Sequence, residues 1–176
     1  MRFEDREIVL KDGRKCILRP TSPEYADQMI EYLEKTSAET PFLLRNPDEV
    51  GFTLESEKEI LSRLMDDPYT IMMCAVVDGK IAGNGSISGI GEKRKIRHRC
   101  SMPIALYKDY WNLGIGTAMI SYMTELAGKI GWHQVDLEVV AENEQAQIYI
   151  RNAVSLKRAE DIMHFFSMTE HITTRY

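Results

Sequence analysis

Apolar residues recur along the chain at two different spacings, and each spacing predicts a different kind of element. Apolar residues at every second position, or in one short run, are typical of strands, whereas apolar residues three and four positions apart are typical of helices. The first spacing predicts a hairpin at Glu7–Pro20 and strands at Thr70–Val77, Lys80–Ile90, Cys100–Leu106 and Gln134–Val140. The second predicts helices that begin near Thr21 and Asn143, and helices over Thr53–Leu64 and Gly114–Ile130.

The order of these elements predicts the fold class. A hairpin and two helices come first, three strands of antiparallel type follow, and a helix, a strand and a further helix come last. The Asp78-Gly79 pair is typical of a tight hairpin turn, whereas the long Gly114–Ile130 helix predicts a crossover between two strands. We therefore expect a single α/β domain over residues 1–176, with a mixed, mostly antiparallel twisted sheet flanked by helices.

Composition narrows the classes of function. The chain has 176 residues and a formal net charge of -5, which disfavours nucleic acid and anionic membranes as partners. Its basic run, Lys93–Arg99, is interpreted as a solvated hairpin tip. The cysteines Cys16, Cys74 and Cys100 are far apart and odd in number, so they fit neither a disulfide framework nor a metal site. We expect a cytoplasmic protein that holds no metal ion.

One turn carries the strongest sign of chemistry. The segment Trp111-Asn112-Leu113-Gly114-Ile115-Gly116 lies between a predicted strand and the start of a predicted helix. The first amides of a helix have no acceptor within the helix and lie at the positive end of its dipole, so they can bind phosphate groups. The alternatives are a tight turn without a ligand and a dinucleotide-binding fold. The dinucleotide motif requires a third small residue, and Met119 occupies that position.

Three further segments accompany this turn, which we call the 111–116 turn. They are Ile104-Ala105-Leu106, Leu137-Glu138-Val139 and Asn143-Glu144-Gln145-Ala146. In chain order, the four segments resemble the I-A-V, Q/R-x-x-G-x-G/A, L-E-V and N-x-x-A motifs of the GNAT superfamily of N-acetyltransferases. One departure is Trp111, where the family usually has Gln or Arg.

The resemblance implies that acetyl-CoA is the cosubstrate, and it indicates which residues would hold it. In the family, the strand before the turn splays away from the next strand and leaves a gap for pantetheine. Pro103 would mark a bulge or an edge there, because it cannot donate to a ladder. An amide of the splayed strand could stabilise the oxyanion of the tetrahedral intermediate. The implied cofactor-binding residues are Ile104, Ala105, Leu106, Trp111, Asn112, Leu113, Gly114, Ile115, Gly116, Thr117 and Asn143.

Two side chains of the implied site have competing interpretations. Asn143 either binds the pantetheine arm through its side-chain amide or caps the helix that follows, a position that Asn also favours. Glu138 corresponds to the residue that serves as the catalytic base in some relatives, and it could equally be a solvent-facing acid of a strand. The family usually forms one wall of its acceptor-binding site, the acceptor wall, in the region around Glu39 and Phe42. These two residues are candidates for binding an amine.

The C-terminal tail departs from the family pattern. Many relatives have a Tyr seven residues after the Asn, which protonates the leaving thiolate, and Ile150 stands there while Tyr149 comes one residue early. A Gly-Phe pair that ends the helix is replaced by Val154-Ser155. Apolar residues at helical spacings predict a helix in the tail in place of closing strands: Leu156, Ala159, Ile162, Met163 and Phe166.

We expect an uncovered sheet edge, a homodimer that covers it, and reduced activity. A one-base shift of the reading frame near codons 147–148 is a hypothesis that would explain the tail. Suitable codons for Tyr149–Ser155, read one base out of step, spell Tyr-Thr-Lys-Cys-Gly-Phe, which is close to the family pattern.

These observations lead to a predicted function. The first hypothesis is an acetyl-CoA-dependent N-acetyltransferase that acts on a primary amine, either of a small molecule or of a protein N-terminus. The second is a catalytically impaired module that binds acyl-CoA, because the tail has lost the thiolate acid. The third is a dinucleotide-binding oxidoreductase.

Overall fold

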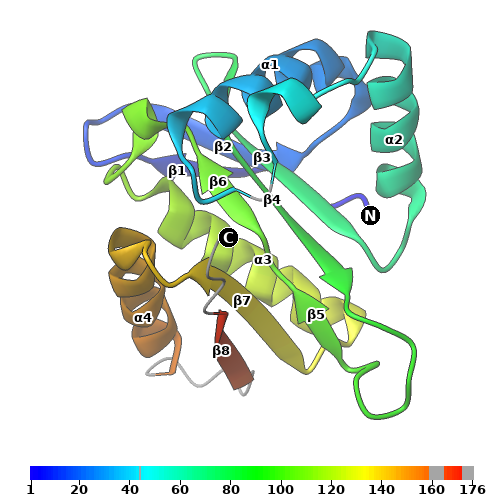
Figure 1. Ribbon diagram of the computed structural model, residues 1–176, viewed down its shortest axis with the longest axis vertical. Coiled ribbons are helices and arrows are strands. Elements are labelled where there is room, and N and C mark those ends of the chain that lie inside the picture. Colours follow the sequence, from blue (N-terminus) through cyan, green and yellow to red (C-terminus); the bar gives the residue numbers. More distant parts are fainter. Residues whose placement is uncertain (44, 159–164, 172–176) are drawn as a thin grey trace.

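The computed structural model describes residues 1–43, 45–158 and 165–171 of the chain, with side chains as far as residue 151 (Figure 1). Within these ranges eight strands form one sheet, in the order β1-β2-β3-β4-β5-β7-β8, with β6 also paired to β4. The strands are β1 Arg6–Val9, β2 Lys15–Pro20, β3 Ile71–Val77, β4 Lys80–Gly89, β5 Arg99–Ser101, β6 Ile104–Leu106, β7 Gln134–Val140 and β8 Phe165–His171. The helices are α1 Ala26–Glu39, α2 Leu54–Asp66, α3 Ile115–Ile130 and α4 Glu144–Arg158, with 3-10 turns η1 Pro23–Tyr25, η2 Pro47–Glu49 and η3 Lys108–Tyr110.

The two faces of the sheet carry different helices. Alternate residues of β3 point to opposite faces, as the strand period of two requires. Met73 and Ala75 join the larger core with Met119 and Met123 of α3. Cys74 and Val76 join a smaller cluster, which contains residues of α1. The central strands are therefore buried on both faces, as the apolar run of Thr70–Val77 predicts.

The segment from β5 to β6 runs along β4 without a change of register. Ser101 pairs with Ser88, and Ile104 pairs with Gly85. Both strands thus advance by the same number of residues, so there is no bulge at Pro103. The carbonyl of Pro103 accepts a hydrogen bond from the Ser86 amide at 3.1 Å. Pro103 therefore marks the start of a free edge, and the alternative of a bulge is wrong.

The C-terminal tail differs from its prediction. The helix from Asn143 onward is confirmed as α4, which ends at Arg158, but the tail then contributes strand β8 at Phe165–His171. β8 lies parallel to β7, with Gln134 opposite Phe165 and Val140 opposite His171. The prediction of a helix through Phe166 is wrong for that residue, because pairing with β7 outweighs local spacing. Ala159, Ile162 and Met163 lie outside the described residues.

Candidate functional site

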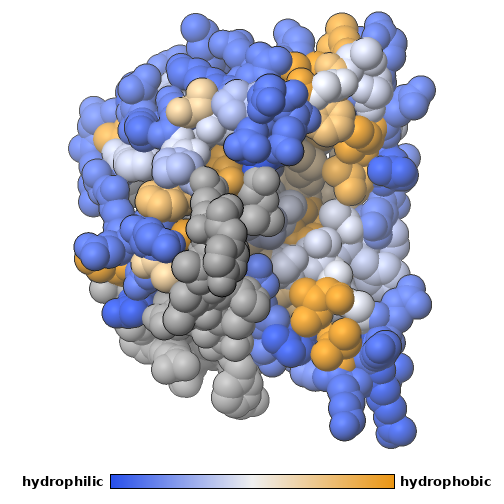
Figure 2. Space-filling view, in the orientation of Figure 1, coloured by the Kyte–Doolittle hydropathy of each residue, from blue (hydrophilic) through white to orange (hydrophobic). Residues whose placement is uncertain are grey.

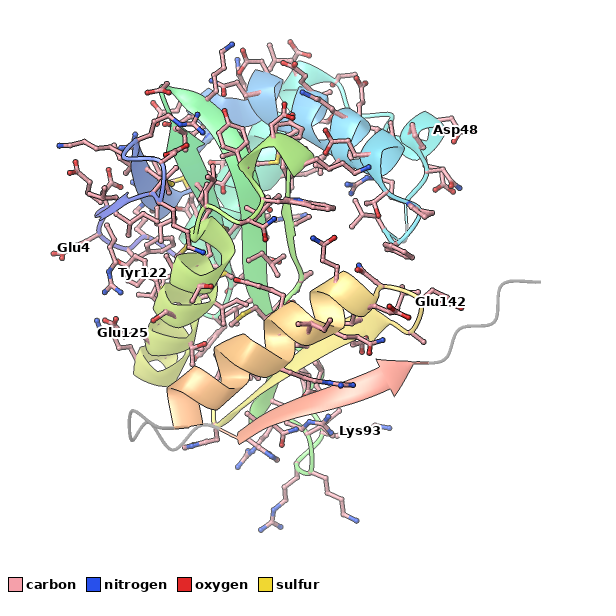
Figure 3. All side chains as sticks on the ribbon, turned by 90° about the vertical axis from the view of Figure 1, so that its left-hand side faces the viewer. Glu4, Asp48, Lys93, Tyr122, Glu125 and Glu142 are labelled. Carbon is pink, nitrogen blue, oxygen red and sulfur yellow. The ribbon has the colours of Figure 1, made fainter. Side chains whose placement is uncertain are left out.

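A fork opens in the sheet where β7 leaves the segment that holds β5 and β6. β5 pairs with β7 in parallel, and the Met102 amide donates to the Asp136 carbonyl at 3.0 Å. Beyond this bond β6 stays with β4, whereas Leu137–Val140 of β7 continue beside β8. We call the space between Ile104–Leu106 and Leu137–Val140 the fork. In Figure 3 the two strands diverge toward the side where Glu142 and Asp48 lie, and Lys93 lies at the other end of the molecule.

Alternation along β6 decides which backbone groups face the fork. Bonds from Ser86 to Pro103 and from Tyr107 to Ala82 flank Ala105, so the peptide groups of Ala105 face β4. Those of Ile104 and Leu106 face the other way. The Leu106 carbonyl accepts from Trp111 Nε1 at 3.0 Å. Among the described residues, the amides of Ile104 and Leu106 and the Ile104 carbonyl have no hydrogen-bond partner.

Tyr32 of α1 is hydrogen-bonded to β6 from the face of the sheet that α1 covers. Its hydroxyl donates to the Ala105 carbonyl at 2.7 Å and accepts from the Asn84 amide at 3.2 Å. Burial raises the pKa of this phenol, so it stays protonated as a donor. Sequence reasoning missed Tyr32 and Asn84, because neither belongs to a motif. Their contact is a tertiary one between a helix and a strand that are far apart in the chain.

The 111–116 turn presents free amides at the start of α3. Gly114 adopts a left-handed conformation with φ of 95°, and Asn112 has φ of 62°. The first helical bond runs from the Ala118 amide to the Gly114 carbonyl at 3.1 Å. The amides of Ile115, Gly116 and Thr117 therefore have no partner in the part of the chain that the structure describes. Three such donors at the positive end of a helix dipole are suited to binding an anion.

Each glycine of the turn has its own structural reason. Gly114 needs its positive φ, and a Cβ there would meet nothing within 4 Å. A Cβ on Gly116 would lie 2.6 Å from the Tyr149 hydroxyl. That hydroxyl donates to Thr117 Oγ1 at 3.2 Å, and burial raises the pKa of the phenol, while the bond to Thr117 lowers it by less. Tyr149 thus lies over the start of α3, whereas Ile150 is buried in the larger core.

Asn143 caps α4. Its Oδ1 accepts a hydrogen bond from the Ala146 amide at 3.1 Å, and its carbonyl accepts from the Gln147 amide at 3.1 Å. Oδ1 therefore acts as the helix cap, as one of the two interpretations of Asn143 predicts. Nδ2 has no partner among the described residues, so a donor is left over for a ligand. The two interpretations of Asn143 use different atoms and are compatible.

Glu138 lies on β7 beyond the last bond to Met102. It is exposed, and the strand period puts its side chain on the same face as Asp136, opposite Leu137 of the larger core. Asp136 is buried and is held by Arg99 at 2.6 Å, so it is committed to joining β5 and β7. Glu138 is therefore the carboxylate of this face that borders the fork.

The end of α1, in the region of the candidate acceptor wall, is tied to η3. Glu39 Oε2 accepts from the Lys108 amide at 3.0 Å, which fixes the end of α1 to η3. Arg45 donates to Ser37 at 3.1 Å. Burial raises the pKa of the Glu57 carboxyl, and the charge of Arg45 lowers it by less. The outer surface of α1, along the top of Figure 2, is hydrophilic.

Other chemistries find little support in the described residues. The three cysteines are buried and free, and burial raises the pKa of Cys100 to about 12, which disfavours a thiolate nucleophile. No group of three or more His, Cys, Asp or Glu side chains within the described ranges could hold a metal ion. The helices that the structure describes include none that is long and apolar enough to cross a membrane.

Comparison with known proteins gives a consistent answer. Residues 24–152 match the Acetyltransferase (GNAT) family. A curated acetyltransferase of Pseudomonas aeruginosa is 23% identical over 130 residues, which cover 72% of this chain and 67% of the relative. A GNAT-family acetyltransferase structure from Streptococcus pneumoniae is 26% identical, with a TM-score of 0.68 and 83% of each chain covered. The PaiA N-acetyltransferase of Thermoplasma acidophilum, solved with coenzyme A, has a TM-score of 0.60 at 15% identity and covers 78% of this chain and 87% of its own.

Proposed function

Because the chain belongs to the GNAT family of acetyltransferases, we propose that it moves the acetyl group of acetyl-CoA to a primary amine, either of a small molecule or of a protein N-terminus. The observation that carries this proposal is that two sets of backbone groups without hydrogen-bond partners occur close together in the chain. The amides of Ile115, Gly116 and Thr117 suit a diphosphate, and the groups of Ile104 and Leu106 that face the fork suit a thioester and its amide-containing arm.

The fork would hold acetyl-CoA in an extended form. The diphosphate would lie on the start of α3, and the pantetheine arm would follow β6 as an extra strand. Asn143 Nδ2 would donate to that arm from the β7 side of the fork. An amide of Ile104 or Leu106 would donate to the acetyl oxygen, whose negative charge grows as the tetrahedral intermediate forms.

In the proposed reaction, a neutral amine attacks the acetyl carbon. A C–N bond forms, the C–S bond breaks, and the amine loses a proton while the leaving sulfur gains one. Glu138 is the proposed base, directly or through a water molecule, because it borders the fork and is exposed. Holding both substrates in attack geometry would supply much of the acceleration without any base.

A second candidate function is a module that binds acyl-CoA but turns it over slowly. It is favoured by the placement of two residues. Ile150, which stands where relatives have the thiolate acid, is buried in the core, and the Tyr149 hydroxyl is bonded to Thr117. The thiolate would then have to leave without a positioned acid, which lowers the rate of turnover but not the affinity for coenzyme A.

Two measurements test these functions: the first separates both of them from a dinucleotide-binding oxidoreductase, and the second separates them from each other. Acetyl-CoA should raise the melting temperature, and NAD should not, since a dinucleotide enzyme would show the reverse. Release of free thiol in the presence of a panel of amines then reports turnover. The transferase predicts amine-dependent release that falls about tenfold or more in Glu138→Gln. Binding without amine-dependent release would instead establish the second function.

A further inference from the structure

The hairpin between β1 and β2 rests on the 111–116 turn, although the two are about a hundred residues apart in sequence. The Lys11 amide donates to the Leu113 carbonyl at 3.2 Å. The Arg14 guanidinium lies over the Tyr110 ring at 5.4 Å from its centroid. These two contacts fix the hairpin beside the residue that precedes Gly114.

The hairpin is a firm support for its side chains. The Leu10 amide donates to the Arg14 carbonyl at 2.8 Å, and the Gly13 amide donates to the Leu10 carbonyl at 2.9 Å. Gly13 supplies the positive φ, at 88°, that this turn needs. The Leu10 side chain is buried in the larger core. The position of Lys11 relative to the turn is therefore set by the fold.

Lys11 is the uncompensated cation of this hairpin. Arg14 is paired with Asp12 at 2.7 Å and lies 4.0 Å from Asp78. Lys15 is paired with Glu7 at 2.9 Å. Lys11 is exposed and has no ion-pair partner among the described residues. Its ammonium group is thus available to an anion.

The anion-binding site has amides but no charge of its own. Between Trp111 and Thr124 the chain carries no charged residue. A diphosphate held by the amides of Ile115–Thr117 alone would keep its negative charge without a counter-ion. A lysine has a long, flexible stem that can bring its ammonium group to such a phosphate, and the resulting charge-assisted hydrogen bond is stronger than a neutral one.

We propose that Lys11 binds the diphosphate of acetyl-CoA, so that the first hairpin supplies the positive charge that the start of α3 lacks. The inference rests on the proposed function, because it concerns the same ligand. It adds a contact from a segment that lies before the family match, which begins at residue 24.

The experiment compares Lys11→Gln with Lys15→Gln, a substitution four positions along the same hairpin. Affinities for coenzyme A and for 3′-dephospho-coenzyme A are measured by calorimetry at two salt concentrations. We expect Lys11→Gln to weaken both ligands about tenfold and to lessen the effect of salt on their binding. Lys15→Gln should bind both as the wild type does, and Lys11→Arg should recover most of the affinity.

Three outcomes would contradict parts of this scheme separately. Unchanged affinity in Lys11→Gln overturns the assignment of Lys11. A loss for coenzyme A with none for the dephospho form also overturns it, since the lysine would then contact the 3′-phosphate. A wild-type protein that binds neither ligand contradicts the proposed function itself.

Discussion

The two sides of the fork are built in different ways. On the β6 side, hydrogen bonds to β4, the Tyr32 hydroxyl and the Trp111 indole hold the strand, and the 111–116 turn follows within a few residues. On the β7 side, the strand beyond Asp136 is paired with β8, which comes from the tail. The side that would bind the diphosphate depends on local backbone geometry, whereas the side that would hold the base, Glu138, depends on the altered tail.

This difference predicts that binding and turnover respond to different changes. Changes in the 111–116 turn, which follows β6, would affect the affinity for coenzyme A. On the other side, Glu138 and the tail would affect the rate of acetyl transfer, whereas Asn143 would contribute to the affinity through the pantetheine arm. Mutations of the 111–116 turn or of Glu138 that shift both quantities together would contradict that division.

The largest effect is expected at the 111–116 turn. Gly114→Asp puts a carboxylate where the diphosphate would lie, so coenzyme A should bind at least about 100-fold more weakly by calorimetry. Gly131→Asp is the matched control. Gly131 also has a positive φ, of 101°, and open space around its Cβ, but it ends the same helix at the opposite terminus. If both variants lose affinity alike, strain and not charge is the cause.

The next effect concerns the tail. If the gene carries a one-base shift near codons 147–148, restoring the frame gives a Tyr seven residues after Asn143. We expect the restored protein to turn over about 10- to 100-fold faster with little change in its affinity for coenzyme A, because an acid for the thiolate returns. Steady-state thiol release compares the two proteins. Sequencing the gene is the direct control, and a DNA sequence that does not encode the family pattern in the shifted frame rules the idea out.

A moderate effect is expected where β5 and β7 are joined by Arg99 and Asp136, which we call the apex of the fork. Asp136→Asn removes the charge partner of Arg99 in a largely buried pair, at 7% and 29% side-chain exposure. The free energy of unfolding in urea should fall by about 2 kcal/mol. Lys15→Gln breaks the exposed pair with Glu7 and should change it by no more than about 0.5 kcal/mol. Equal losses in the two variants would show that burial at the apex is unimportant.

A separate effect is expected from pH, and it concerns buried thiols of β2, β3 and β5, outside the two sides of the fork. Burial raises the pKa of Cys16 to about 11 and those of Cys74 and Cys100 to about 12. In the unfolded chain these thiols have a pKa of about 8.5. Raised folded values add stability below the unfolded pKa, which is lost as pH rises toward the folded ones. Urea unfolding should therefore give a lower free energy at pH 10 than at pH 8, by about 2 kcal/mol per thiol, and a Cys74→Ala variant should lose less.

Most of the fold could be predicted because strong spacings coincide with real elements. The hairpin, the helix at Gly114–Ile130 and the strand at Gln134–Val140 are confirmed as β1–β2, α3 and β7. The tail could not be predicted in the same way. Its apolar residues also satisfy helical spacing, and only the parallel partner β7 selects the extended form at Phe165–His171.

The site was predictable where it depends on the backbone of one segment. The 111–116 turn and Ile104–Leu106 could be located from their motifs, but the division between Ala105 and its neighbours needed the register with β4. The contact of Tyr149 with Thr117 could not be located, because it joins two helices through the end of a long side chain. Lys11 belongs to no motif and becomes relevant only through the docking of the hairpin.

β5 and β6 keep one continuous register along β4, so the peptide groups of alternate residues face β4 and the fork in turn. Met102, Ile104 and Leu106 form one row of peptide groups: the Met102 amide bonds to β7, the Leu106 carbonyl bonds to Trp111, and the remaining groups of Ile104 and Leu106 have no partner among the described residues. Inserting one residue after Pro103 would exchange the two rows, so that groups now bonded to β4 would face the fork. Inserting two would restore the row. The number of residues between Met102 and Leu106 therefore decides which backbone groups face the fork.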